Sequence, residues 1–177
     1  MTLEIFTASE QDKPIVRRML ELYQYDLSPF ANADLNEHGE FGYAYLDHYW
    51  TESGRYPFLA KLAGKLVGFA LVNTHHYLPA SEYSMAGFFV LKRYRRQGLG
   101  QQFAVHVFEQ RRGTWEVRQL PGNVRAPSFW KRIIGDYTAG AFKEIAEGHG
   151  EWKGPILQFT NVASANQTLQ ATRYPRA

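Results

Sequence analysis

The sequence predicts a mixed α/β domain, of the α+β kind, in which helices flank a sheet. Runs of apolar residues with helical spacing alternate along the chain with short, aromatic-rich runs that are typical of strands. The strand patterns dominate the middle of the chain. No linker or internal repeat divides the 177 residues, so we expect a single domain over residues 1–177.

The first half of the chain predicts a helix, a loop, a second helix and a strand pair. Asp12 can cap the first helix, with Pro14 in its first turn, and one apolar face follows: Ile15, Met19, Leu22 and Tyr23. Residues 28–42 are polar and interrupted by Pro and Gly, which indicates a loop. A short helix at 43–52 precedes two strands within 56–77, which meet at a turn over 63–65.

The second half begins with an apolar, aromatic stretch at 82–91, which predicts a buried central strand. A helix follows, because five apolar residues recur at helical spacing: Leu99, Phe103, Ala104, Val107 and Phe108. The remaining patterns predict a strand at 114–120, a short helix at 126–134, strands within 140–148 and 154–163, and a frayed tail.

Positive charge is concentrated in one segment. Residues 1–91 carry 6 positive and 11 negative side chains, whereas residues 92–132 carry 10 positive and 2 negative ones. This asymmetry indicates a polyanion beside residues 92–132 and favours a cation on the other side. An uneven scatter of ordinary surface charge is the alternative.

The composition excludes several classes of site. The chain has no Cys, which excludes disulfides, Cys metal sites and a thiol nucleophile. The start of the chain does not resemble a secretory signal, and no stretch approaches the roughly 20 apolar residues of a membrane span. We therefore expect a cytoplasmic protein with no membrane partner. His75 and His76 point to opposite faces of a strand, so we expect no metal site.

The stretch YRRQGLG, residues 94–100, lies between the predicted central strand and the following helix. The N-terminus of a helix presents unpaired N–H groups and a partial positive charge, which suit a phosphate group. Gly98 and Gly100 allow close approach of a ligand to the backbone, and Arg95 and Arg96 add forked donors. The stretch therefore predicts a diphosphate cradle, although it has neither a P-loop nor a Rossmann pattern. A basic surface turn is the alternative.

The pattern Arg95-x-x-Gly98-x-Gly100 resembles the Arg/Gln-x-x-Gly-x-Gly/Ala motif of the GNAT superfamily of acyl-CoA-dependent N-acetyltransferases. Three further stretches resemble that family: FFVLKRYRRQGLG its fourth strand and following loop, LAKLAGKLVGFALV its second and third strands, and Asn123, Ala126, Phe129 and Trp130 its Asn-x-x-Ala-x-x-Phe-Tyr element. The resemblance is clear over residues 58–135.

The resemblance implies a mostly antiparallel sheet whose fourth and fifth strands splay apart to hold acetyl-CoA, the acyl donor. The loop amides would bind the diphosphate and the fourth strand the pantetheine arm. The cofactor-binding residues implied are Phe89, Val90, Leu91, Arg95, Arg96, Gln97, Gly98, Leu99, Gly100, Gln101, Asn123 and Trp130.

Two positions depart from the family pattern. Gly87 stands where many relatives carry a Glu or Asp base, and Trp130 stands where they carry the tyrosine that protonates the leaving sulfur. Glu82 is the nearest carboxylate, but it reaches the site only if a bulge changes the strand register. Tyr137 is a candidate acid two helical turns after Trp130. Alternatively, ordered water removes the proton, or the chain is catalytically impaired.

The expected function is acetyl transfer from acetyl-CoA to a primary amine of a small molecule or peptide. An acyl-CoA-binding module with little turnover is the alternative, and a nucleic-acid binder is a weaker third reading. Carboxylates at 34–40 could attract a cationic amine, or form a solvated loop. Seven aromatic residues in and around that loop could line an acceptor pocket, or belong to the core: Tyr23, Tyr25, Phe30, Phe41, Tyr43, Tyr45 and Tyr49. The sequence identifies no acceptor and leaves a homodimer open.

Overall fold

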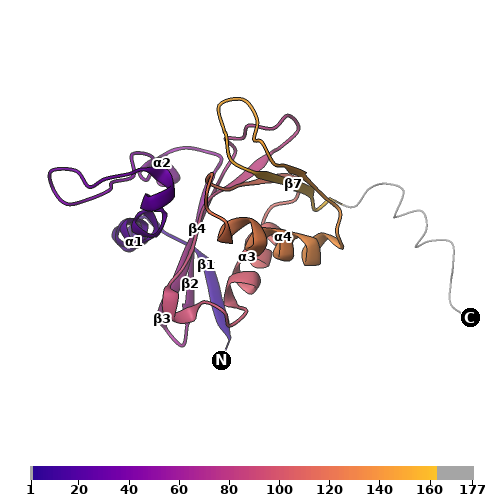
Figure 1. The fold of residues 1–177 in the computed structure, drawn as a ribbon. Coiled ribbons are helices and arrows are strands. Elements are labelled where there is room, and N and C mark those ends of the chain that lie inside the picture. Colours follow the sequence, from indigo (N-terminus) through magenta and orange to yellow (C-terminus); the bar gives the residue numbers. More distant parts are fainter. Residues whose placement is uncertain (1, 163–177) are drawn as a thin grey trace, which may run out of the picture.

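Seven strands form one sheet in the order β1-β2-β3-β4-β5-β7-β6 in the computed structural model, which describes residues 2–162 (Figure 1). All neighbouring strands are antiparallel except β4 and β5, which are parallel. The predicted class is therefore confirmed. The strands are β1 (Leu3–Thr7), β2 (Arg55–Leu62), β3 (Lys65–Asn73), β4 (Tyr83–Val90), β5 (Thr114–Arg118), β6 (Phe142–Ile145) and β7 (Ile156–Thr160).

Helices cover both faces of the sheet. In the described part of the chain the α-helices are α1 (Lys13–Ala31), α2 (His48–Thr51), α3 (Leu99–Glu109) and α4 (Arg125–Thr138), and the 3-10 turns are η1 (Glu10–Asp12) and η2 (Lys92–Tyr94). Helices α1 and α2 lie on one side of the sheet and α3 and α4 on the other (Figure 1). Each pair covers its own apolar core.

Side chains of β3 alternate between the two faces of the sheet and so contribute to both apolar cores. Phe69 and Leu71 are buried on the α1 side, whereas Ala70 and Val72 are buried on the α3 side. Successive side chains of a strand point to opposite faces, so a strand covered on both sides reads as a continuous apolar run. This is why residues 66–72 show no polar alternation.

Helix α1 begins where the sequence predicts but ends later. The predicted loop starts at Ser28, yet the helix continues through Pro29 to Ala31 and ends at Asn32, which has φ 49°. Proline cannot donate to the carbonyl of Tyr25. The hydroxyl of Ser28 donates to that carbonyl instead, at 2.9 Å, so the proline leaves no acceptor unpaired at that turn.

The apolar face of α1 also differs from the prediction at one position. Val16, Met19 and Leu20 are buried, but Leu22 is 49% exposed. Val16, Met19, Leu20 and Tyr23 follow the i, i+3, i+4, i+7 spacing of one helical face, and Leu22 lies outside that stripe. The prediction that Leu22 faces the core was therefore wrong.

Most other elements lie close to their predicted positions, but the helix predicted at 43–52 is a single helical turn, α2, that begins only at His48. The β2–β3 hairpin turns at Ala63 and Gly64, which have φ values of 50° and 74°, and α4 is longer than its predicted 126–134 core. Strand β1, which pairs with β2, was not predicted. The predicted frayed tail lies outside the described residues. Within residues 2–162, no helix combines the length and apolar character needed to cross a membrane.

Candidate functional site

The parallel strands β4 and β5 separate soon after they begin. Two residue pairs join them, Tyr83 with Trp115 and Ser84 with Glu116. The later residues of β4 are not paired with β5. A register shift against β3 lies at the same level, because Leu71 pairs with Gly87 and Val72 with Met85. The extra residue of this β-bulge is Ala86. The predicted splay is therefore confirmed, with a bulge at its narrow end.

The basic turn lies at the C-terminal end of β4 and leads into α3. Arg96 and Gly98 have φ values of 62° and 77°, which bring the chain sharply into the helix. Gly98 is exposed, and a Cβ placed on it would meet no atom within 4 Å. Leu99 is buried at the start of α3 and anchors the turn to the core. The backbone at Gly98 is therefore open to a ligand.

The N-terminus of α3 has no side-chain cap. Its first main-chain bond runs from the N–H of Gln102 to the carbonyl of Gly98, at 3.2 Å. The N–H groups of the preceding residues in the first turn have no partner within the helix, as at any helix start. Gly100 lies under the ring of Phe129, whose atoms would be 3.3 Å from a Cβ. A larger residue at 100 would therefore displace that ring.

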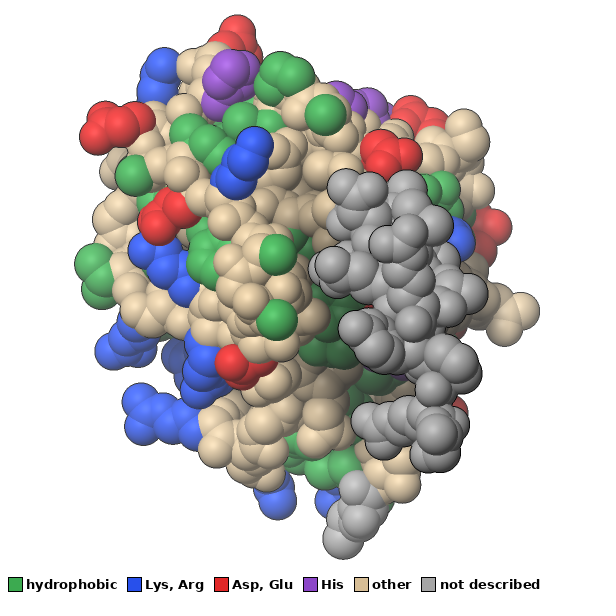
Figure 2. All heavy atoms as spheres, turned by 90° about the vertical axis from the view of Figure 1, so that its right-hand side faces the viewer, with side chains coloured by type: hydrophobic (Ala, Val, Ile, Leu, Met, Phe, Trp, Pro, Cys, Tyr) green, Lys and Arg blue, Asp and Glu red, His purple; other side chains and the backbone are tan. Residues whose placement is uncertain are grey.

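Arg95 and Arg96 have different surroundings. Arg95 donates from Nε to the carbonyl of Val90 at 2.6 Å and from Nη2 to Asp26 on α1, so its charge is already paired. Arg96 is exposed in the same turn. Figure 2 shows the side of the molecule that carries α3 and α4, where Lys and Arg side chains gather toward the lower left.

Asp26 is the counter-ion of this turn. Partial burial alone would raise the pKa of its carboxyl, but hydrogen bonds and charge attraction from Arg95 and Lys92 hold that pKa below its usual value. Its Oδ1 atom lies 3.1 Å from Nζ of Lys92. The carboxylate therefore ties both ends of the turn to α1.

The remaining predicted cofactor residues lie along the gap or beside it. Phe89 packs in the core on the α1 side, and the N–H of Leu91 donates to the carbonyl of Val67 at 2.9 Å. Asn123 accepts a bond from the N–H of Ala126 at 3.3 Å and so supports the start of α4. The ring of Trp130 is buried, with its centroid 5.1 Å from that of Phe88 on β4. Trp130 therefore packs against the strand that borders the gap.

Gly87 occupies the position at which the family resemblance implies a carboxylate. A Cβ placed on it would point to the α1 side of the sheet, 3.4 Å from Cε2 of Phe69 and 3.6 Å from Cβ of Leu71. The backbone there has room for a small side chain. No acid group is present at this position.

The two candidate catalytic residues from the sequence lie elsewhere. Glu82 accepts a bond from the N–H of Thr114 at 2.8 Å, at the closed end of the β4–β5 pair. The bulge that Glu82 would need does exist, but it follows Ser84 in the chain, so it does not turn the carboxylate toward the open gap. Glu82 closes the strand pair instead.

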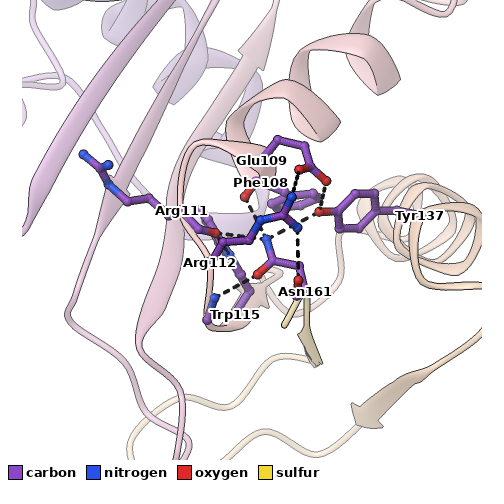
Figure 3. Close-up of polar contacts among 8 residues, drawn as sticks. Phe108, Glu109, Arg111, Arg112, Trp115, Tyr137 and Asn161 are labelled. Carbon is purple, nitrogen blue, oxygen red and sulfur yellow. Dashed lines mark hydrogen bonds and ion pairs between the residues drawn. The ribbon is translucent and has the colours of Figure 1, made fainter. Parts of the chain in front are cut away.

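Tyr137 belongs to a polar cluster at the end of α3 farthest from the basic turn (Figure 3). Its hydroxyl donates to Glu109 and accepts from Asn161, at 3.4 Å. Burial, and then the bond to Glu109, raise the pKa of the tyrosine. Helix α3 has 11 residues, so about 15 Å of helix separates the two ends. The geometry favours a structural role for Tyr137.

A cavity of about 430 Å3 lies beside the bulge. Ala86 and Arg118 line it from the two separating strands, and Asn73 from the end of β3. The other lining residues are Tyr43, Tyr45, Arg55, His75, His76 and Tyr77. The carboxylates of residues 34–40 do not line it. Among the aromatic residues considered for an acceptor pocket, Tyr43 and Tyr45 do.

Tyrosines of this region remain protonated at neutral pH. Burial raises the pKa of Tyr23 to about 12 and also raises the pKa values of Tyr43 and Tyr49. Their hydroxyls are therefore hydrogen-bond donors. Sequence reasoning missed Arg55, Asn73 and Arg118, because they are far apart in the chain and share no motif. Only the strand order and the bulge bring them together.

Comparison with protein families matches residues 19–135 to the acetyltransferase (GNAT) family. Comparison with curated proteins finds no match. Three solved structures share the fold at low identity. The first is a histone acetyltransferase HPA2 and related acetyltransferase from Corynebacterium glutamicum, with a TM-score of 0.68, 13% identity, and coverage of 93% of this chain and 99% of the other.

The second is the ribosomal-protein-S18-alanine N-acetyltransferase from Escherichia coli, with a TM-score of 0.60, 15% identity, and coverage of 93% and 98%. The third is AAC(6')-Iy in complex with the bisubstrate analog CoA-S-monomethyl-acetylneamine, with a TM-score of 0.54, 15% identity, and coverage of 75% and 90%. These likenesses concern the fold, whereas the family match covers more than half of the sequence. The chain belongs to the acetyltransferase (GNAT) family.

Proposed function

We propose that this protein transfers an acetyl group directly from acetyl-CoA to a primary amine, in the cytoplasm. The observation that carries the proposal is that β4 leaves β5 after two residue pairs and then leads through the basic turn into α3. In a chain with this family's motif, the separation of the two strands would hold an extended ligand and the start of α3 would bind its anionic end.

The diphosphate would lie against the main-chain N–H groups of residues 97–101. Gly98 leaves the backbone open, and Arg96 adds an exposed charge. Arg95 acts as a positioning residue, because its guanidinium is bonded to Val90 and Asp26. The pantetheine arm would follow main-chain groups of residues 89–91. Asn123 and Trp130 would border it from the α4 side.

The reaction joins the amine nitrogen to the acetyl carbon and breaks the carbon–sulfur bond. The amine must first be neutral, whereas a lysine-like amine has a pKa of about 10.4. Main-chain N–H groups near the bulge would stabilise the developing oxyanion. Gly87 provides no base, so the amine proton leaves to water, and the thiolate of CoA departs.

An acyl-CoA-binding module with little turnover is the second candidate. The lack of a carboxylate at Gly87 and the buried indole at Trp130 favour it, since indole is a donor but not a useful acid. The binding path does not depend on either side chain. The two candidates therefore differ in turnover and not in cofactor affinity.

Two measurements test the proposal. Acetyl-CoA should raise the melting temperature of the purified protein, because a ligand of the native state stabilises it. Release of free thiol from acetyl-CoA should then depend on an added amine from a panel. Binding without amine-dependent release would favour the module, and the absence of any thermal shift would exclude both candidates.

A further inference from the structure

The cavity beside the bulge adjoins the place where the proposed reaction would occur. Ala86 and Arg118 each follow the last β4–β5 pair by two residues, from opposite sides of the gap. Gly87, at the family's usual base position, is the next residue of β4. A molecule in the cavity could therefore present an amine to a thioester in the gap. The inference that follows rests on the proposed function.

Hydrogen-bond donors and cations dominate the lining. None of the described residues that line the cavity is Asp or Glu, whereas two are arginines and two are histidines. Tyr43 adds a hydroxyl whose raised pKa keeps it protonated. Such a lining is poorly suited to a polyamine or another acceptor with several positive charges.

The two arginines differ in how fully they are paired. Arg55 donates from Nε to Glu52 at 2.7 Å, and its guanidinium lies 5.5 Å from the centre of the Tyr49 ring. Its side chain is only 7% exposed. Arg55 is therefore already neutralised by its neighbour and contributes mainly to the wall of the cavity.

Arg118 is fixed in position but only partly paired. Its guanidinium lies near the rings of Tyr77 and Trp152, at 4.9 and 5.1 Å, and Nη2 donates to Ser84 at 3.3 Å. Its Nε atom is buried and has no hydrogen-bond partner among the described residues. This buried Nε does not face the cavity, whereas Nη1 makes no hydrogen bond to the described residues and Nη2 makes only the bond to Ser84, so the outer edge of the guanidinium retains donor capacity toward the cavity.

The nearest carboxylate does not use that capacity. Glu116 is fully buried, and its oxygens accept bonds from the N–H groups of Tyr77 and Leu78 at 2.9 to 3.2 Å. Its Oε1 atom lies 3.6 Å from Nε of Arg118, which is too long for a hydrogen bond. Glu116 thus holds the β3–β4 loop in place and forms an ion pair with the Nε side of Arg118, so only the terminal Nη groups of Arg118 are available to a ligand.

We propose that the cavity binds an acceptor that carries a carboxylate together with its primary amine, that is, an amino acid, with the carboxylate on Arg118. A forked guanidinium matches a planar carboxylate, and stacking on two rings keeps it in one orientation. The amine of the bound molecule would point toward Gly87. The cations around it would also lower the pKa of that amine and favour its neutral, reactive form.

The test compares acceptors in pairs that differ only by the carboxylate. Phenylalanine is compared with phenethylamine, and lysine with 1,5-diaminopentane, by thiol release at saturating acetyl-CoA. We expect kcat/KM to be at least tenfold higher for the amino acid in each pair. A third pair, O-phosphoethanolamine and ethanolamine, tests whether a phosphate group is preferred instead of a carboxylate. Equal values within the pairs, or a preference for phosphate alone, would overturn the inference.

Variants connect the preference to Arg118. Arg118→Lys keeps the charge beside Glu116 but removes the fork, and Arg118→Gln removes the charge. Each should reduce the amino-acid preference by tenfold or more while the thermal shift with acetyl-CoA is retained. Arg111→Lys is the matched control, because that guanidinium also lies over a tyrosine, 3.9 Å from the centre of the Tyr56 ring, outside the cavity. A preference unchanged in both Arg118 variants would contradict the assignment.

Calorimetry decides the question if turnover is absent. The complex with CoA should bind N-acetylphenylalanine at least tenfold more tightly than N-acetylphenethylamine. Equal binding of the two would overturn the inference even if the protein is only a binding module. Failure of acetyl-CoA itself to bind would instead remove the proposed function, and with it the carboxylate site.

Discussion

Arg95 at the turn before α3 donates a hydrogen bond to Asp26 on α1, 69 residues earlier in the chain. The same guanidinium also donates to the carbonyl of Val90, where β4 ends. One side chain thus joins the end of the central strand, the proposed diphosphate turn and the helix on the other side of the sheet. The first arginine of the motif therefore shapes the turn.

Replacing Asp26 by Asn should loosen this turn. The variant loses two partly exposed ion pairs, to Arg95 and to Lys92, which together cost about 1 to 2 kcal/mol. Acetyl-CoA should bind several-fold more weakly, because the turn is less well fixed. Asp34→Asn, in the exposed loop before α2, is the control and should change neither quantity. Thermal melts and calorimetry measure both. An unchanged affinity for acetyl-CoA in Asp26→Asn would show that the turn holds its shape without the pair.

The stability difference between wild type and Asp26→Asn should also depend on pH. The folded pKa of Asp26 is lowered from its ordinary value of 3.8. The carboxylate therefore contributes its full stabilisation above the unfolded pKa and loses it as the pH falls through the folded value. Denaturation at pH 7 and at pH 3 should show the two proteins converging in acid. A constant difference would contradict this linkage.

Comparing Gly98→Ala with Gly64→Ala should distinguish the effect of backbone strain on stability from the effect of a methyl group on acetyl-CoA binding. Gly98 has φ 77° and open space around it, and Gly64 in the β2–β3 turn has φ 74° and equally open space. Alanine at either position should destabilise the fold by about 1 kcal/mol. Only Gly98→Ala should also weaken acetyl-CoA binding, by tenfold or more, since its methyl group occupies the cradle. Equal affinities in the two variants would place the ligand elsewhere.

The sequence predicts those parts of the fold and site that are local. The turn, the start of α3 and the β2–β3 hairpin follow from Gly98, Leu99 and Gly64, because backbone conformation and spacing are encoded within a few residues. The end of α1 was missed because the hydroxyl of Ser28 replaces the donor that Pro29 lacks. Such a compensation is not visible in a propensity pattern.

The cavity could not be predicted, because its residues meet only in the tertiary structure. Arg118 and Tyr43 are 75 positions apart in the chain, and the bulge at Ala86 decides which of their neighbours face the gap. The charge pattern was also incomplete as a guide. It did not separate the residues of the cavity from the rest, because Arg55 from the acidic half and Arg118 from the basic segment both line it.

Tyr137→Phe tests whether this hydroxyl takes part in the chemistry. Its bonds to Glu109 and Asn161 at the far end of α3 indicate a structural contribution, so the variant should lose about 1 kcal/mol of stability and keep kcat within twofold. Thr138→Ala, which removes a hydroxyl bonded to the carbonyl of Ile134 at 2.7 Å, is the neighbouring control. A tenfold loss of kcat in Tyr137→Phe alone would restore the tyrosine as the acid.

Gly87→Glu should increase turnover, because it returns a carboxylate to the position where many family members carry their base. The Cβ would enter ordinary contact with Phe69 and Leu71 on the α1 side, so the backbone can accept it. Those apolar neighbours should raise the pKa of the new carboxyl from about 4.3 toward neutrality. General-base catalysis typically contributes at least a hundredfold, and we expect at least a tenfold rise in kcat at neutral pH.

Gly87→Gln is the control for this change, because it has nearly the same size and no base. The Glu variant should show a new acidic limb in its pH–rate profile that the Gln variant lacks, while both bind acetyl-CoA as the wild type does. If the larger side chains destabilise the strand, Gly87→Asp provides the same test with a shorter one. Equal rates for the acid and amide variants, with cofactor affinity retained, would show that the amine loses its proton by another route. Ordered water around the cationic cavity would then remain as the acceptor of that proton.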